Sequence, residues 1–195
     1  MIIEKELSFI LTMDQLKNVE RRNFNLDDSR RENTAEHSWQ VVILAQVLYP
    51  YAKNKEQIDL LRVLKMLSIH DIVEIKAGDT FIFDEKKMVG KYQRELKAAE
   101  ELFGMLPDEL GKEFLNLWIE FEKEETHDAV FAAAVDRIMP FILNVHNKGV
   151  SWTEANITSE MVDSIVGKAV VRASDAFREA YDLLKLRAIS EGKLL

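Results

Sequence analysis

Residues 60–75 read LLRVLKMLSIHDIVEI, an apolar run that ends at His70 and Asp71 before the apolar spacing resumes. Apolar side chains recur in it every three or four positions, which predicts a helix over about Glu56–Lys76. The whole chain holds only 7 glycines and 3 prolines, so few residues interrupt helices. We therefore predict an all-α fold that forms a single domain over residues 1–195.

The same spacing predicts six further helices along the chain. A polar stretch, Glu20–Asn33, separates the first two of them and carries four arginines without a helical pattern. The predicted helices cover about Ile3–Val19, Thr34–Pro50, Glu85–Gly104 and Ser159–Ser190, and two more begin near Pro107 and Thr126.

The chain contains no cysteine, which excludes disulfides and thiolate metal sites. A bound metal ion would therefore need imidazole and carboxylate ligands. No apolar run approaches the ~20 residues that span a bilayer, and Met1–Leu16 lacks the basic-then-apolar order of a signal peptide. The sequence thus predicts a soluble, cytoplasmic protein that has no membrane partner.

The formal net charge of the chain is −8 at pH 7. Such a surface repels the phosphate backbone of nucleic acids, so we expect no nucleic-acid partner. A small phosphorylated substrate is still compatible with this charge, because one metal ion and a few arginines can invert the potential inside a cleft.

The polar residues at the end of the apolar run predict a site of chemistry. A buried carboxylate such as Asp71 is costly unless it is paired or binds a metal. Glu74 lies four residues after His70 on the same predicted helical face, and Asp79 follows just past the helix end. Because crowded carboxylates shift one another's pKa values unless a cation neutralises them, this cluster suits metal binding or acid–base catalysis.

Two further polar residues occupy unusual places. Asp136 follows the apolar stretch 131–135 on a helix that we expect to be buried, and His37 falls in the first turn of the helix that begins near Thr34. Taken alone, each is more often structural: a salt-bridged carboxylate or an ordinary helical histidine. Their order along the chain together with His70 and Asp71 is far more specific.

The other histidines and the tryptophans fit structural positions. We expect His127 and His146 at the surface, and Trp39, Trp118 and Trp152 in the core. An apolar stripe on the last predicted helix packs either on the core or against a second copy of the chain, and a homodimer is the expected assembly. The stripe comprises Met161, Val162, Ile165, Val166, Val170, Val171, Ala176, Tyr181 and Leu184.

The ordered set His37, His70-Asp71 and Asp136 resembles the signature of the HD-domain phosphohydrolase superfamily. The surrounding sequence is similar to the branch that contains bacterial 5′-deoxynucleotidases and their eukaryotic relatives. The resemblance spans roughly residues 5–145. Its matching pieces are Leu16–Arg21, Glu32–Trp39, His70–Glu74 with Gly78-Asp79, and Ala134–Arg137.

The resemblance implies a helical fold with a metal ion near its centre. His37, His70, Asp71 and Asp136 match the metal ligands of the family residue by residue. We expect a single divalent ion, and this ligand set suits Zn²⁺, Mn²⁺, Co²⁺, Fe²⁺ or Ni²⁺ better than Mg²⁺.

The resemblance also implies roles for residues around the metal. Glu74 matches a catalytic carboxylate, and Asp79 matches a residue near the substrate sugar. Arg21 matches the arginine that binds the phosphate, although Arg22 can be aligned in its place. The family usually has a tryptophan shortly after this arginine to shape the sugar pocket, and the nearest aromatic residue here is Phe24.

The expected activity is therefore hydrolysis of deoxynucleoside 5′-monophosphates, with a small nucleotide as the substrate partner. Two alternatives remain open from the residues. The same site could act on another nucleotide, such as a triphosphate or a cyclic or pyrophosphate-bearing one. The chain could also be a non-catalytic binding module that keeps its metal for stability, although such a module would need neither Glu74 nor Asp79.

Overall fold

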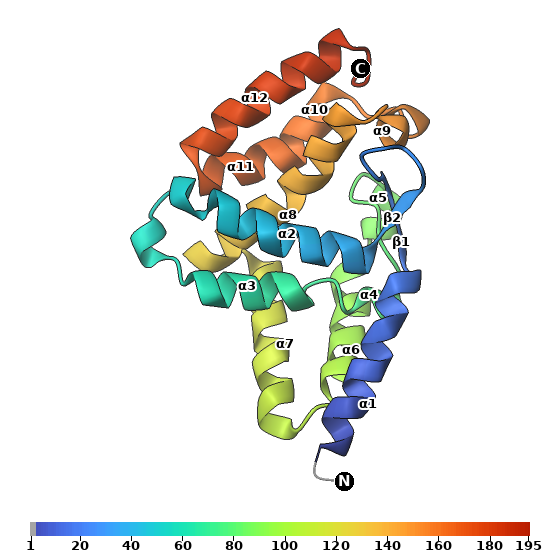
Figure 1. The fold of residues 1–195 in the computed structure, drawn as a ribbon, viewed down its shortest axis with the longest axis vertical. Helices are drawn as coiled ribbons and strands as arrows, with labels where there is room; N and C mark the ends of the chain where they lie inside the picture. Colours follow the sequence, from blue (N-terminus) through green and yellow to red (C-terminus); the bar gives the residue numbers. More distant parts are fainter. Residues whose placement is uncertain (1–2) are drawn as a thin grey trace.

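The computed structural model describes residues 3–195, the side chain of Glu85 excepted, and shows a mostly helical protein (Figure 1). Helices α2 (Thr34–Leu48) and α3 (Leu60–Ile69) cross the middle of the molecule in front of the long α8 (His127–His146). Below them stand α1 (Glu4–Met13), α6 (Lys91–Phe103) and α7 (Asp108–Lys123). The prediction of an all-α fold is confirmed, apart from one small hairpin.

The last third of the chain forms the upper part of Figure 1. There α11 (Lys168–Ala173) and α12 (Asp175–Ser190) pack against α8. The shorter helical elements are η1 (Asp14–Asn18), η2 (Tyr49–Tyr51), η3 (Lys55–Gln57), α4 (Glu74–Ala77), α5 (Glu85–Met88), α9 (Val150–Glu154), α10 (Ser159–Val162) and the π-helical η4 (Asp163–Gly167).

Helix α8 is the central core helix, and α2, α3, α7, α11 and α12 all contact it. By length and composition it could cross a membrane, but 67% of its most apolar window is buried inside the structure. That burial is typical of the core helix of a soluble protein. Asp136 is half-buried on this packed helix, so its backbone is held firmly while its side chain reaches a cavity.

The predicted helix over Glu56–Lys76 is wrong in one important respect: it is interrupted. Helix α3 ends at Ile69, and the chain then turns before α4 begins at Glu74. In the turn, the amides of Ile72 and Glu74 bond to carbonyls three residues back, the tighter 3₁₀ pattern. No glycine or proline marks this break, so packing against the rest of the molecule overrides the helical pattern.

The polar stretch between the first two helices is an antiparallel hairpin that the sequence analysis did not predict. Strand β1 (Glu20–Phe24) pairs with β2 (Arg31–Asn33). Arg31 bonds to Glu154 of α9, and the side chain of Asn147 bonds to the carbonyl of Phe24. These contacts hold the hairpin against the end of α8, so its arginines have fixed positions.

Several other boundaries differ from the prediction. The predicted first helix becomes α1 followed by η1, and Asn33, with its capping box to Glu36, is the N-cap of α2. Gly90, at φ 69, divides the predicted fourth helix into α5 and α6. The predicted last helix is divided into α10, η4, α11 and α12, and α9 was not predicted.

Burial supports most of the expected core. Trp118 and Trp152 are buried, and His127 and His146 are exposed, as predicted. The prediction for Trp39 is wrong, because 67% of it is exposed on the outer face of α2. In the apolar stripe of the last predicted helix, the buried members Val162, Val166, Val170 and Tyr181 pack into the protein's own core.

Candidate active site

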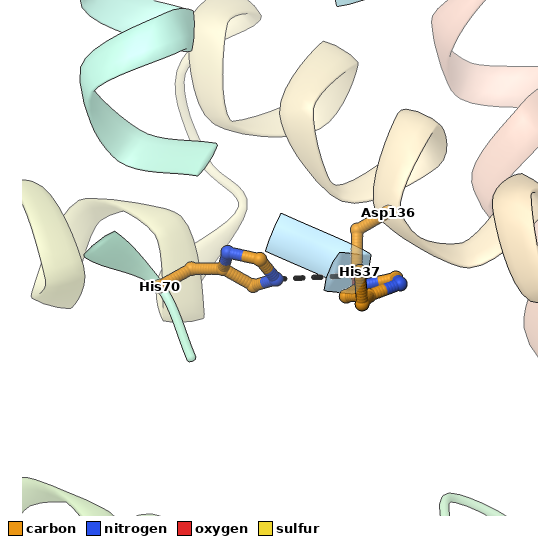
Figure 2. Close-up of side chains that lie close together, drawn as sticks. All are labelled: His37, His70 and Asp136. Atoms are coloured by element: carbon orange, nitrogen blue, oxygen red, sulfur yellow. Dashed lines mark hydrogen bonds and ion pairs between the residues drawn. The ribbon is translucent and has the colours of Figure 1, made fainter. Parts of the chain in front are cut away.

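Three of the four predicted metal ligands converge from different helices (Figure 2). His37 comes from the first turn of α2, His70 from the residue that caps α3, and Asp136 from the middle of α8. His37 Nε2 lies 2.8 Å from Asp136 Oδ1, and His70 Nε2 lies 3.3 Å from the same oxygen. One potential ligand atom from each residue falls within 4.8 Å of the others.

Asp71, the fourth predicted ligand, lies at the edge of this group. Its Oδ2 is 3.3 Å from His70 Nε2 and 3.9 Å from His37 Nε2. The same oxygen accepts a 2.8 Å hydrogen bond from Arg21 Nη1. The structure thus gathers all four side chains around one point and adds an arginine to them.

The orientation of His70 fits a metal ligand. Its Nδ1 lies 2.9 Å from the carbonyl of Leu67, which can only accept, so Nδ1 carries the proton. Nε2 is therefore the nitrogen that can bind a metal; without one it faces Asp71 and Asp136, and although burial opposes this, they raise the pKa of His70 well above its usual value. Nε2 is buried and has no hydrogen-bond partner among the described residues. A buried, unpaired nitrogen aimed at two carboxylates is costly by itself and fits a divalent cation.

The charges of the site point to the same conclusion. Six carboxylates lie around the imidazoles and Arg21. Arg21 is within 4.0 Å of four of them, and Lys91 is 3.9 Å from Glu122. Although burial disfavours charge, the two histidines hold the pKa of Asp136 well below its usual range, and His70 and Arg21 lower that of Asp71. The six are Glu32, Asp71, Glu74, Asp79, Glu122 and Asp136.

The two predicted catalytic carboxylates lie beside Arg21. Its Nη1 is 4.0 Å from Glu74 Oε1 and 3.9 Å from Asp79 Oδ1. Glu74 Oε2 accepts a 2.8 Å hydrogen bond from the hydroxyl of Thr34, which leaves Oε1 facing Arg21. Burial, together with the charge of Asp71, raises the pKa of Glu74 well above its usual value.

Glu32 was not among the predicted site residues. Its carboxylate is 2% exposed and lies 3.6 Å from Arg21 Nε and 3.7 Å from His37 Nδ1. Burial raises the pKa of Glu32 to about 7, although Arg21 opposes this shift. Glu32 stands five residues before His37 in the matching piece Glu32–Trp39, and this proximity was the one signal in the sequence. From its position Glu32 can orient the imidazole of His37 through Nδ1.

These residues form one end of a cavity of about 440 Å³. We call this the charged end; its lining includes Arg21, His70, Asp71, Glu74, Asp79 and Asp136. The other, apolar end is lined by Phe81, Phe83, Met88, Val162, Ile165 and Val166. Lys91 and Glu122 also line the cavity, and the sequence analysis assigned a role to neither.

The three predicted substrate-binding residues of the hairpin are separated by the structure. Arg21 is at the charged end, while Arg22 lines the cavity with its guanidinium over the ring of Phe81. Phe24 does not line the cavity; its ring packs under the guanidinium of Arg31. Asn23, to which the sequence analysis gave no role, lines the cavity instead.

Comparison with known families agrees with this geometry. The model of the HD domain matches residues 13–178, which include every candidate ligand. The chain belongs to the HD-domain family. A crystal structure of a predicted metal-dependent phosphohydrolase from Magnetospirillum magnetotacticum is similar to this HD domain at a TM-score of 0.92 and 40% identity, covering 98% of this chain and 95% of that one.

Curated relatives show lower identity. The 5′-deoxynucleotidase HDDC2 of Danio rerio is 28% identical over 74% of this HD-domain chain and 70% of its own length. The human protein of the same name is also 28% identical, over 67% of this chain and 62% of its own length. A 5′-deoxynucleotidase from Shewanella oneidensis is 26% identical over 79% of this chain and 84% of its own.

Proposed function

We propose that the protein is a metal-dependent 5′-nucleotidase that hydrolyses deoxynucleoside 5′-monophosphates to nucleosides and orthophosphate. The convergence of His37, His70 and Asp136 at the charged end of the cavity carries this proposal. The substrate class is supported by the names of the curated relatives, which are 5′-deoxynucleotidases.

In this proposal His37, His70, Asp71 and Asp136 would hold one divalent ion. When bound, the ion supplies Lewis-acid polarisation of the phosphoryl oxygens and a lowered pKa for water. Two imidazoles and two carboxylates would leave two positions open on a six-coordinate ion, whereas they would close a tetrahedral one. The mixed ligand set suits Zn²⁺, Mn²⁺, Co²⁺, Fe²⁺ or Ni²⁺.

Arg21 would bind the phosphate. Its side chain is 14% exposed, so it reaches the cavity while it remains buried among carboxylates. Those carboxylates, led by Asp71, raise its pKa despite its burial, and it stays a full positive charge. Arg22 lies further along the cavity wall against Phe81, where it can meet the substrate beyond the phosphate.

Glu74 would move the proton that hydrolysis requires. Because Thr34 holds Oε2, Oε1 is the atom that exchanges a proton with the attacking water or with the leaving 5′-oxygen. Asp79 follows Gly78, whose φ of 74 turns the chain back toward Arg21. From there Asp79 would contact the sugar side of the phosphate and keep Arg21 in place.

The test is a screen of purified, metal-reconstituted protein against nucleoside mono-, di- and triphosphates. We expect orthophosphate and free nucleoside from the deoxynucleoside monophosphates. Release of triphosphate or pyrophosphate would mean that the same site acts on a different class of nucleotide. Metal binding without release of any phosphate would leave a binding module and contradict the proposal.

We also propose that the protein is cytoplasmic and forms a homodimer. The apolar stripe of the last predicted helix is largely packed into the core, but α2 carries a second apolar stripe that is exposed. Trp39, Ile43 and Val47 lie four residues apart on it and are 67%, 43% and 61% exposed. Light scattering should give twice the chain mass of 22.5 kDa, and Trp39→Ser should reduce it to that of one chain.

A further inference from the structure

Asn23 is a buried polar side chain on the cavity wall with no role in the proposed reaction. Along β1, Glu20 and Arg22 are exposed, Arg21 is half-buried and Asn23 is buried, although the pairing of this strand is irregular between Glu20 and Phe24. Asn23 is 8% exposed and lines the same cavity as the candidate metal ligands. A buried amide in such a place needs a hydrogen-bond partner at each end.

A chain of hydrogen bonds fixes the orientation of this amide. The Nδ2 of Asn144 donates to the carbonyl of Pro140 at 2.9 Å and to Oδ1 of Asn23 at 3.1 Å. Ser151 donates its hydroxyl to Oδ1 of Asn144. Because the carbonyl of Pro140 can only accept, neither amide can be reversed without losing bonds.

The fixed orientation leaves one donor unused. The Nδ2 of Asn23 makes no hydrogen bond to any residue that the structure describes. Among the described residues, Nδ2 of Asn23 is not one of the unpaired atoms that are fully buried. Because Asn23 lines the cavity, this atom is accessible from there. The arrangement holds an N–H donor toward the space that a substrate would occupy.

Two measures place this donor next to the phosphate position. Asn23 is two residues from Arg21 on β1, so their Cα atoms are at most about 7 Å apart, and both residues line the cavity. On α8, Asn144 folds back to bond Pro140, which lies one turn, about 6 Å, beyond Asp136. The sugar is the group attached directly to the phosphate, so both measures place the donor at the level of the sugar.

We propose that Asn23 donates a hydrogen bond from Nδ2 to an oxygen of the substrate sugar, with Ser151 and Asn144 as positioning residues. This inference rests on the proposed function, since it assumes a nucleoside monophosphate with its phosphate at Arg21. It assigns sugar recognition to a polar residue, whereas Phe24, the aromatic side chain expected there, packs outside the cavity.

The test compares Asn23→Ala with the wild-type protein on four 5′-monophosphates of one base: ribo, 2′-deoxy, 3′-deoxy and 2′,3′-dideoxy. Removal of the recognised oxygen should cost the wild-type enzyme up to about tenfold in kcat/KM, the scale of one hydrogen bond. The same removal should cost the variant little, because its donor is already absent. A loss that is equal across the four substrates would overturn the proposal.

Binding of the four corresponding nucleosides, measured by calorimetry, gives a second readout that needs neither turnover nor metal. The same oxygen should matter to the wild-type protein and not to the variant. If the wild-type enzyme releases phosphate from none of the nucleotides, the proposed function fails. If the wild-type enzyme is active but depends on neither oxygen, or if Asn23→Ala keeps the full wild-type dependence, only the role of Asn23 fails.

Asn147→Ala is the matched control. Asn147 also ties β1 to the end of α8, through the carbonyl of Phe24, but it does not line the cavity. This control should lower the melting temperature without changing the ranking of the four substrates. Ser151→Ala should weaken the oxygen dependence less than Asn23→Ala does, because it loosens the donor without removing it.

Discussion

The two ends of the cavity are built from different kinds of structure. The charged end takes its ligands from α2, α3 and α8, and the carboxylates and imidazoles there are buried against one another. The apolar end is made by the segment between Gly78 and Gly90, both at positive φ, and by the five-residue π-helix η4. Changes at the charged end should therefore remove the chemistry, whereas changes at the apolar end should only adjust which substrates bind.

The largest effect is expected for His70→Ala and Asp136→Ala. Each substitution removes one metal ligand, and the ligands that remain are too few to hold the ion. Both metal content and activity should therefore be lost. Elemental analysis and phosphate release measure the two properties. His127→Ala, at an exposed histidine of the same α8, is the control and should behave as wild type, while full metal and activity in His70→Ala would refute the site.

Glu74→Gln should separate catalysis from metal binding. We expect retained metal and a fall in turnover of about 10²–10⁴-fold, the usual scale of a lost general acid or base. The measurement is kcat alongside metal content. Glu101→Gln, an exposed glutamate that bonds to Lys76, serves as the control. Normal turnover in Glu74→Gln would remove this residue from the mechanism.

The pair Arg21→Ala and Arg22→Ala should distinguish the two arginines. Loss of a charged contact to phosphate at Arg21 should raise KM by about 10- to 100-fold. Arg22→Ala should change KM less, since its guanidinium lies over Phe81 and has no ion pair with the candidate metal ligands among the described residues. Steady-state kinetics on one deoxynucleotide measures KM for both variants. A larger increase in Arg22→Ala than in Arg21→Ala would assign phosphate binding to Arg22.

The smallest effect is expected at the apolar end. Phe83→Ala should raise KM for nucleotides by about fivefold, which corresponds to partial loss of one buried aromatic contact. A simple phosphomonoester that has no base should be hydrolysed equally by the variant and the wild type. An equal loss on both substrates would mean that the two ends of the cavity are not separable.

The sequence predicted the centre of the molecule better than its edges. His37, His70, Asp71 and Asp136 are adjacent in space, as the motif implied, because such side chains leave few other ways to satisfy their charge. The break after Ile69 could not be predicted, since the apolar spacing continues across it with no glycine or proline and only the packed structure imposes the turn.

Residues of the hairpin were harder to interpret for a physical reason. Alternation over so few polar residues is a weak signal, and β1 is stabilised by contacts with distant residues such as Asn144 and Asn147. Consequently the sequence did not indicate that Asn23, and not Phe24, lines the cavity. Trp39 was placed wrongly because a tryptophan on an outward helical face breaks the usual relation between size and burial.

The hydrogen bond between Arg21 and Asp71 has a consequence for the end of the catalytic cycle. The guanidinium already has an anionic partner, so an arriving monoester must share its positive charge with that carboxylate. After hydrolysis, inorganic phosphate likewise competes with Asp71 for Arg21. Because Asp71 keeps part of the charge of Arg21, the product anion is bound less tightly than by an unpaired arginine, and this favours its release before the next turnover.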